Sequence, residues 1–96
     1  MMRAMAKPGY SESKERLQRR LARIEGQVRG VERMVEDDRY CIDVLTQISA
    51  IRAGLDQVAL NLVDGHTRNC VAKASGREQD EHVGELMGAL DRLLAR

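Results

Sequence analysis

Aromatic residues are almost missing from this sequence: its 96 residues include two tyrosines and no phenylalanine or tryptophan. A hydrophobic core must therefore be aliphatic. β-Strands, which favour aromatic and β-branched residues in alternation, are not indicated. No apolar run approaches the roughly 18 residues of a membrane-spanning helix, and no signal-peptide pattern is present. We expect an all-α protein of the cytoplasm with no membrane partner.

The length allows one small domain, which we place over residues 1–96. The beginning of the chain, with Pro8 and Gly9, lacks any hydrophobic period, so residues 1–12 are expected to form a flexible arm. A chain this short buries little surface, and oligomerisation is an expected source of its stability.

Charge is balanced overall but divided along the chain. The net charge is +1, yet residues 1–33 carry nine basic and four acidic side chains, 9 − 4 = +5. The remainder carries seven basic and eleven acidic side chains, 7 − 11 = −4. A basic first third suggests a face that binds a polyanion.

Apolar residues recur at steps of three or four along three stretches, which predicts three helices. The first begins after a cap at Ser11 or Ser13 and carries a heptad-like seam: Leu17, Leu21, Ile24, Val28, Val31 and Val35. The second is a long central helix over residues 40–74, with Asp37 or Asp38 as its cap; it ends around Ala74-Ser75-Gly76, where glycine fits the C-terminal position. The apolar stripe of this helix comprises Ile42, Leu45, Ile48, Ile51, Leu55, Val58 and Leu62. The third helix spans about residues 78–95.

The stripe of the long helix leads to His66 and Cys70, which are four residues apart and one turn apart on one face. Cys41 lies 25 positions before His66, roughly 37 Å away along an unbroken helix. Two copies packed antiparallel around Gly54 would bring Cys41 of one chain to His66 and Cys70 of the other. Glycine at that point would let two backbones approach closely. The spacing thus predicts a symmetric four-helix-bundle dimer with two sites built from both chains.

Two thiolates and one imidazole form a soft, low-coordinate ligand set that favours Cu(I), whereas structural Zn(II) takes four protein ligands. An alternative is that His66 and Cys70 are buried residues of the helix that bind no metal. The separation of Cys41 favours the metal interpretation. A thiol switch also stays open, because Cys41 and Cys70 of two chains would be neighbours able to form a disulfide.

A basic stripe borders the seam of the first helix. Arg16, Arg20 and Arg23 follow the helical spacing, and Lys14 and Arg19 lie beside them. A solvated helix face is the commoner meaning of such a stripe, with intrahelical pairs such as Glu25 with Arg29. The functional interpretation is phosphate contact along double-stranded DNA.

The segment Tyr40-Cys41-Ile42-Asp43-Val44-Leu45-Thr46-Gln47-Ile48-Ser49-Ala50, followed by His66-x-x-x-Cys70, resembles the copper-sensitive operon repressor (CsoR) family of the CsoR/RcnR superfamily. The earlier Arg20-Leu21-Ala22-Arg23-Ile24-Glu25-Gly26-Gln27-Val28-Arg29-Gly30 is similar to that family's first helix. The resemblance covers about residues 14–95.

This resemblance implies an all-α dimer that pairs into a tetramer, binds operator DNA without metal and releases it when Cu(I) binds. It implies Cys41 as the ligand from one protomer, with His66 and Cys70 from the other. Tyr40 and Glu85 match residues that hydrogen-bond near the histidine ligand. Arg20 matches an arginine that contacts DNA, whereas a second such arginine, on the long helix, is Gln57 here.

We therefore expect a Cu(I)-responsive transcriptional repressor. One alternative is a persulfide or redox sensor that uses Cys41 and Cys70. Another is a copper-buffering protein with no role on DNA. An enzyme is not indicated, because no base is paired with a nucleophile in the sequence.

Overall fold

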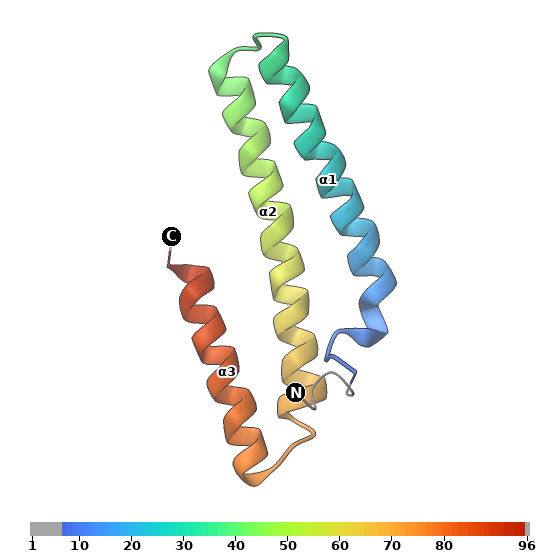
Figure 1. The fold of residues 1–96 in the computed structure, drawn as a ribbon, viewed down its shortest axis with the longest axis vertical. Coiled ribbons are helices and arrows are strands. Elements are labelled where there is room, and N and C mark those ends of the chain that lie inside the picture. The colour runs from blue at the N-terminus through green and yellow to red at the C-terminus, as the bar shows by residue number, and fades with distance from the viewer. Residues whose placement is uncertain (1–6, 96) are drawn as a thin grey trace. The chain divides into compact units, whose positions relative to one another are not determined.

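The computed structural model describes residues 7–95, which form helices and no strand. The elements are the 3-10 helix η2 (Ser11–Ser13), α1 (Lys14–Glu36), α2 (Cys41–His66), the π-helix η3 (Thr67–Val71) and α3 (Gly76–Leu94) (Figure 1). The predicted all-α class with three helices and a long central one is confirmed. No helix in this part of the chain is long and apolar enough to cross a membrane.

The chain divides into two compact units, and α2 runs through both. One unit, the hairpin unit, is Ser13–Leu60 and contains α1 and most of α2. The other, the ligand-turn unit, combines the described residues of Met1–Glu12 with those of Asn61–Arg96. That the units fold as one domain stays a prediction.

The hairpin unit is held by a narrow aliphatic seam. Leu17 and Ile24 of α1 are buried against Ile51 and Val58 of α2, and Val31 packs onto this cluster. Residues seven apart recur on both helices, as in coiled-coil packing. A Cβ added at Gly54 would lie 3.3 Å from Ile24 Cδ1 of the same chain. Gly54 therefore makes room for Ile24 of α1 inside the hairpin, and a close approach of two copies at this residue stays a prediction.

The residues after α1 form a Schellman motif that terminates α1, and they do not cap α2. Asp38 has a φ of 56°, and its N–H donates to the carbonyl of Val35 at 3.1 Å. The N–H of Arg39 reaches back to Met34 at 2.9 Å, which completes the motif. The expectation that Asp37 or Asp38 caps the long helix is thus wrong. The carbonyl of Tyr40 accepts the first bonds of α2, from Asp43 and Val44.

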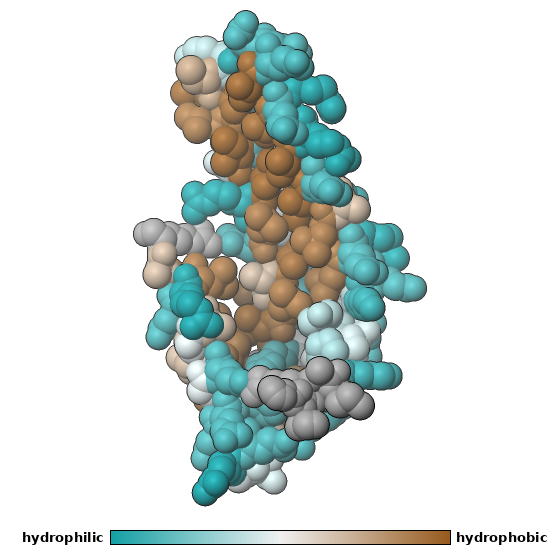
Figure 2. All heavy atoms as spheres, in the orientation of Figure 1, coloured by the Kyte–Doolittle hydropathy of each residue, from teal (hydrophilic) through white to brown (hydrophobic). Residues whose placement is uncertain are grey.

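Much of the apolar surface of the hairpin unit stays exposed. Leu45 is 56% exposed, and the seam residues Val28 and Val35 are 46% and 61% exposed. Figure 2 shows hydrophobic residues gathered in a broad band along the α1–α2 hairpin. A contiguous apolar band of this kind marks an interaction surface.

The second unit contains the end of α2, and that end differs from the prediction. α2 stops at His66 and continues as the π-helix, in which the N–H of Ala72 donates to Thr67 at 2.9 Å. Gly76 does not end this helix. It begins α3, with a φ of +59°, a backbone conformation that residues other than glycine rarely adopt.

Part of the predicted flexible arm makes close contacts in the ligand-turn unit, while residues 1–6 lie outside the described residues. Gly9 and Gly65 are both buried and meet backbone to backbone. The amide of Asn69 donates to the carbonyl of Gly9 at 2.8 Å. Residues 8–10 therefore lie against the turn that carries His66 and Cys70.

We expect Gly65→Ala to destabilise the protein by roughly 1–3 kcal/mol, because the added Cβ would lie 2.8 Å from the carbonyl oxygen of Gly9. Backbone atoms cannot rotate away as a side chain can. The matched control is Gly84→Ala on α3, where nothing lies within 4 Å of the new Cβ. That change should stabilise the helix by up to about 1 kcal/mol. Urea denaturation checks both signs, and equal effects of the two substitutions would contradict the packing argument.

Candidate metal centre and nucleic-acid face

His66, the last residue of α2, is half-buried and oriented by His82 of α3. Its Nε2 lies 3.4 Å from the main-chain carbonyl oxygen of His82, and the two rings meet edge to face with centroids 5.5 Å apart. A carbonyl can only accept a hydrogen bond, so this contact puts the proton of a neutral His66 on Nε2. Nδ1 then keeps the lone pair that a metal ligand needs.

Cys70 is a free, half-buried thiol within the π-helix. Its turn is fixed by Gln79 of α3, whose amide donates to the carbonyls of Val71 at 2.9 Å and Ala74 at 3.0 Å. A cavity of about 520 Å³ is lined by Lys7, Pro8, Gly9, Tyr10, Leu62, His66, Cys70 and His82. Two of the three predicted ligands therefore share one cavity.

Cys41 is the first residue of α2, in the hairpin unit, and its thiol is free and exposed. It stands at the opposite end of α2 from His66. Among the residues that the structure describes, no three His, Cys, Asp or Glu side chains come close enough to hold a metal. Within one chain, the imidazole of His66 and the thiol of Cys70 therefore lie together, whereas the thiol of Cys41 does not join them.

The two residues matched by resemblance lie in different units. Glu85 of α3 lines a second cavity with His66, of about 340 Å³. Its carboxylate Oε1 is 3.5 Å from Nδ1 of His82. Tyr40 precedes α2 in the hairpin unit and is 69% exposed.

An ion pair spans the junction between α2 and the π-helix. Arg68 donates from Nε to Asp64 Oδ1 at 2.8 Å. This hydrogen bond, together with the carboxylate charge, raises the pKa of Arg68. The guanidinium is thereby held by the carboxylate one turn earlier in the chain.

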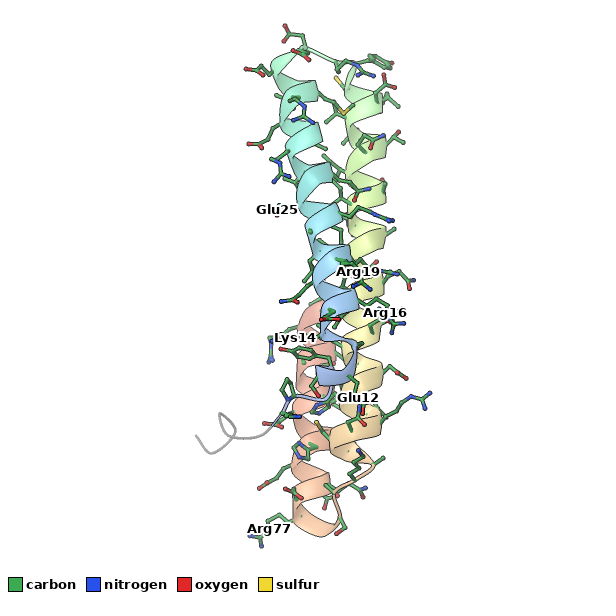
Figure 3. The ribbon with its side chains drawn as sticks, turned by 90° about the vertical axis from the view of Figure 1, so that its right-hand side faces the viewer. Glu12, Lys14, Arg16, Arg19, Glu25 and Arg77 are labelled. Atoms are coloured by element: carbon green, nitrogen blue, oxygen red, sulfur yellow. The ribbon has the colours of Figure 1, made fainter. Side chains whose placement is uncertain are left out.

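The five basic residues of the predicted DNA-binding stripe lie on the first three turns of α1. Figure 3 shows Arg16 and Arg19 extending to the same side of this helix, with Lys14 on its other side. Lys14, Arg16, Arg19 and Arg23 are exposed, and Arg20 is half-buried. None of the five makes a salt bridge within residues 7–95, whereas Arg29 pairs with Glu25 at 3.9 Å. Their charges are therefore available to an anionic partner.

Over residues 13–92 the sequence matches the family of metal-sensitive transcriptional repressors. The chain belongs to this family. It is 49% identical to the copper-sensing transcriptional repressor RicR of Mycobacterium tuberculosis over 89 residues, 90% of this chain and 93% of that protein. It is 47% identical to the copper-sensing transcriptional repressor CsoR of Bacillus subtilis, over 80% of this chain and 77% of that protein.

Among solved structures, the fold is similar to the copper-sensing repressor CsoR with Cu(I) from Geobacillus thermodenitrificans. The TM-score is 0.78 and the identity 52%, over 85% of this chain and 86% of that chain. These relatives confirm the resemblance and the expectation of a regulator rather than an enzyme. Membership in a family of transcriptional repressors implies DNA binding.

Three groups beside the candidate ligands were not predicted from the sequence: His82, Asn69 with Gly9, and Gln79. His82 falls within the predicted third helix, residues 78–95. A signal was present, since His82 and Glu85 are three residues apart and share one face of α3. The other two groups carried no sequence signal, because they act through main-chain carbonyls.

Proposed function

We propose that this chain is a cytoplasmic Cu(I)-responsive repressor that binds operator DNA without metal and releases it when Cu(I) binds. The genes derepressed would be those of copper resistance. The observation that carries this proposal is the ligand set Cys41, His66 and Cys70, in a chain about half identical to copper-sensing repressors.

The chemistry of the three side chains supports Cu(I). Two thiolates and a neutral imidazole suit a soft monovalent ion in a low coordination number. The carbonyl of His82 leaves Nδ1 of His66 for the metal, and Cys70 lines the same cavity. When bound, the ion supplies a link between Cys41 of one chain and the pair of the other.

The proposed assembly is an antiparallel dimer that pairs into a tetramer. The band of exposed apolar residues on the hairpin unit supports the dimer, because an apolar surface of this extent is typically buried against a partner. Among residues 7–95, the buried large apolar residues are Leu17, Ile24, Ile51 and Val58, a small core for a chain of this length. A second copy supplies the missing burial and the missing thiol together.

Copper binding and DNA binding are coupled through this interface. Cys41 must approach His66 and Cys70 of the partner chain at one particular distance for all three to share an ion. A DNA-binding arrangement in which that distance differs is depopulated as the ligands engage copper. The basic stripe on α1 belongs to the same hairpin as Cys41, so it moves with the interface.

An operator titration tests the proposal. The metal-free protein should bind its operator under anaerobic reducing conditions, and one Cu(I) per chain should weaken that binding by about 5- to 150-fold. Fluorescence anisotropy with a labelled duplex measures both states. Copper binding without any effect on DNA affinity would support a copper-buffering protein instead.

Arg20→Ala should weaken operator binding by the metal-free protein and leave the copper stoichiometry unchanged. Loss of one phosphate contact per chain lowers the salt dependence of the affinity by about one unit for each contact removed. Arg29→Ala is the matched control, because Arg29 lies on the same helix, outside the stripe, and pairs with Glu25. If both variants retain the wild-type affinity and salt slope, the stripe does not contact DNA.

A persulfide or redox sensor is the second candidate, favoured by the exposed free thiol of Cys41. His66→Ala distinguishes the two functions. A copper sensor should lose its Cu(I) response in this variant. A thiol sensor should keep its response to persulfide or oxidant and lose it only on Cys41→Ala or Cys70→Ala.

A further inference from the structure

His82 touches the candidate ligand His66 in two separate ways. Its carbonyl oxygen is 3.4 Å from Nε2 of His66, and its ring lies edge to face against the His66 ring at an interplanar angle of 83°. The first contact fixes which nitrogen carries the proton. The second restricts rotation of the imidazole about its Cβ–Cγ bond. One residue thus controls both the protonation pattern and the plane of a metal ligand.

The ring of His82 is itself held beside a carboxylate. Its Nδ1 is buried and makes no hydrogen bond to the described residues, yet Oε1 of Glu85 lies 3.5 Å away. A shift of a few tenths of an ångström closes this gap to a hydrogen bond. Glu85 is one turn further along α3, so the same helix carries both groups. The order in space is carboxylate, His82 ring, His66 ring.

Carboxylates commonly orient metal-binding imidazoles through a hydrogen bond, and loss of such partners weakens metal affinity. Here the carboxylate of Glu85 contacts a histidine that in turn contacts the ligand. No three His, Cys, Asp or Glu side chains within residues 7–95 converge on one point, so His82 and His66 do not form a chelate with Cys70. The geometry favours an indirect role for His82.

We propose that His82 is a positioning residue for the copper ligand His66 and that Glu85 acts on His66 through the His82 ring. The inference rests on the proposed function, because it takes His66 as a Cu(I) ligand. Glu85 holds the His82 ring, and the ring and carbonyl of His82 present Nδ1 of His66 to the metal. Copper affinity therefore depends on two residues that do not bind copper.

The test compares full-length variants in a Cu(I) competition titration with a chromophoric chelator, under anaerobic conditions. His82→Gln should lower the Cu(I) affinity by on the order of 10- to 100-fold, as is typical of residues that support a ligand. His82→Phe, which retains an aromatic edge against His66, should lose less than His82→Gln. Glu85→Gln should weaken copper binding in the wild-type background and change nothing further in His82→Gln.

The matched control is Glu81→Gln, the same chemical change on an exposed carboxylate of α3. It should leave the affinity within about twofold of wild type, well below the 10-fold effect expected of a supporting residue. X-ray absorption at the copper edge adds a readout that a general loss of stability does not change. The shell of two sulfurs and one nitrogen should be kept in every variant. Circular dichroism and operator affinity of the metal-free proteins show that each variant is folded, and His82→Phe carries the test if His82→Gln is not.

Three results would overturn the inference. Wild-type affinity in both His82 variants would remove the positioning role. Full additivity of Glu85→Gln and His82→Gln would show that Glu85 acts by another route. Loss of an imidazole from the copper shell in His82→Gln would make His82 a ligand. Failure of the wild-type protein to bind Cu(I) would instead refute the proposed function, which separates the two conclusions.

Discussion

A mixture of Cys41→Ala and Cys70→Ala chains should bind Cu(I) tightly, although neither variant does so alone. In the proposed antiparallel dimer, each site takes its first thiol from one chain and the other two ligands from its partner. A mixed dimer then contains one intact site, with Cys41 from the Cys70→Ala chain and with His66 and Cys70 from the Cys41→Ala chain. Its second site lacks both thiols. We expect one tight copper per mixed dimer.

The experiment requires exchange of subunits, which mild denaturation and refolding of the mixture provide. Copper affinity is then measured by chelator competition, as for each variant alone. Loss of one thiolate from a three-ligand site should cost at least the 10- to 100-fold that loss of a mere supporting residue costs. Restoration in the mixture is therefore a large signal.

The matched control mixes His66→Ala with Cys70→Ala. Both substitutions damage the same half of the site, so every dimer of this mixture lacks a ligand at each site. No tight binding should return. Equal behaviour of the two mixtures, restored or not, would contradict a site divided between Cys41 and the pair at the other end of α2. The separation of these residues along one helix of 26 residues is the reason to expect the division.

The helices of this fold were predictable because apolar spacing is a local property. The steps of three and four residues placed all three helices, and α3 begins and ends within two residues of its prediction. The end of α2 was not predictable. No proline or glycine lies between His66 and Ala74, so nothing local marks the change to the π-helix. The contacts that hold it are long-range: Asn69 within it donates to the carbonyl of Gly9, and Gln79 of α3 donates to that of Val71. π-Helical turns are frequent at functional sites.

The roles of the glycines were the hardest to predict from the sequence. Gly54 packs against Ile24 of α1 within one chain, a contact that the apolar spacing does not indicate, while Gly76, which the sequence predicts to end one helix, begins another. The role of a glycine depends on which atoms lie where its Cβ would be. That depends on tertiary packing, which the local sequence does not give. The ligands were easier to find, because Cys41, His66 and Cys70 are recognisable by chemistry and spacing.

Leu45→Lys should separate the proposed dimer and, with it, abolish tight copper binding. Leu45 is 56% exposed in the single chain and lies on the apolar stripe of α2. Full burial of a leucine side chain contributes about 1.5–3 kcal/mol, so burial of the exposed part of Leu45 contributes roughly half of that, and a two-fold axis repeats the loss in both chains. The dimer should therefore lose about 2–3 kcal/mol, a weakening on the order of 30- to 200-fold.

The control for this substitution is Gln47→Lys, which adds the same charge to an exposed polar position two residues away. Sedimentation measures the dimer, and chelator competition measures copper binding in the same samples. In Leu45→Lys both should recover together as protein concentration rises, because a dissociated chain holds His66 and Cys70 without the partner's Cys41. The unfolding midpoint should depend on concentration for the same reason. Tight copper binding by chains that sediment as monomers would mean that one chain completes the site alone, against the position of Cys41 at the far end of α2.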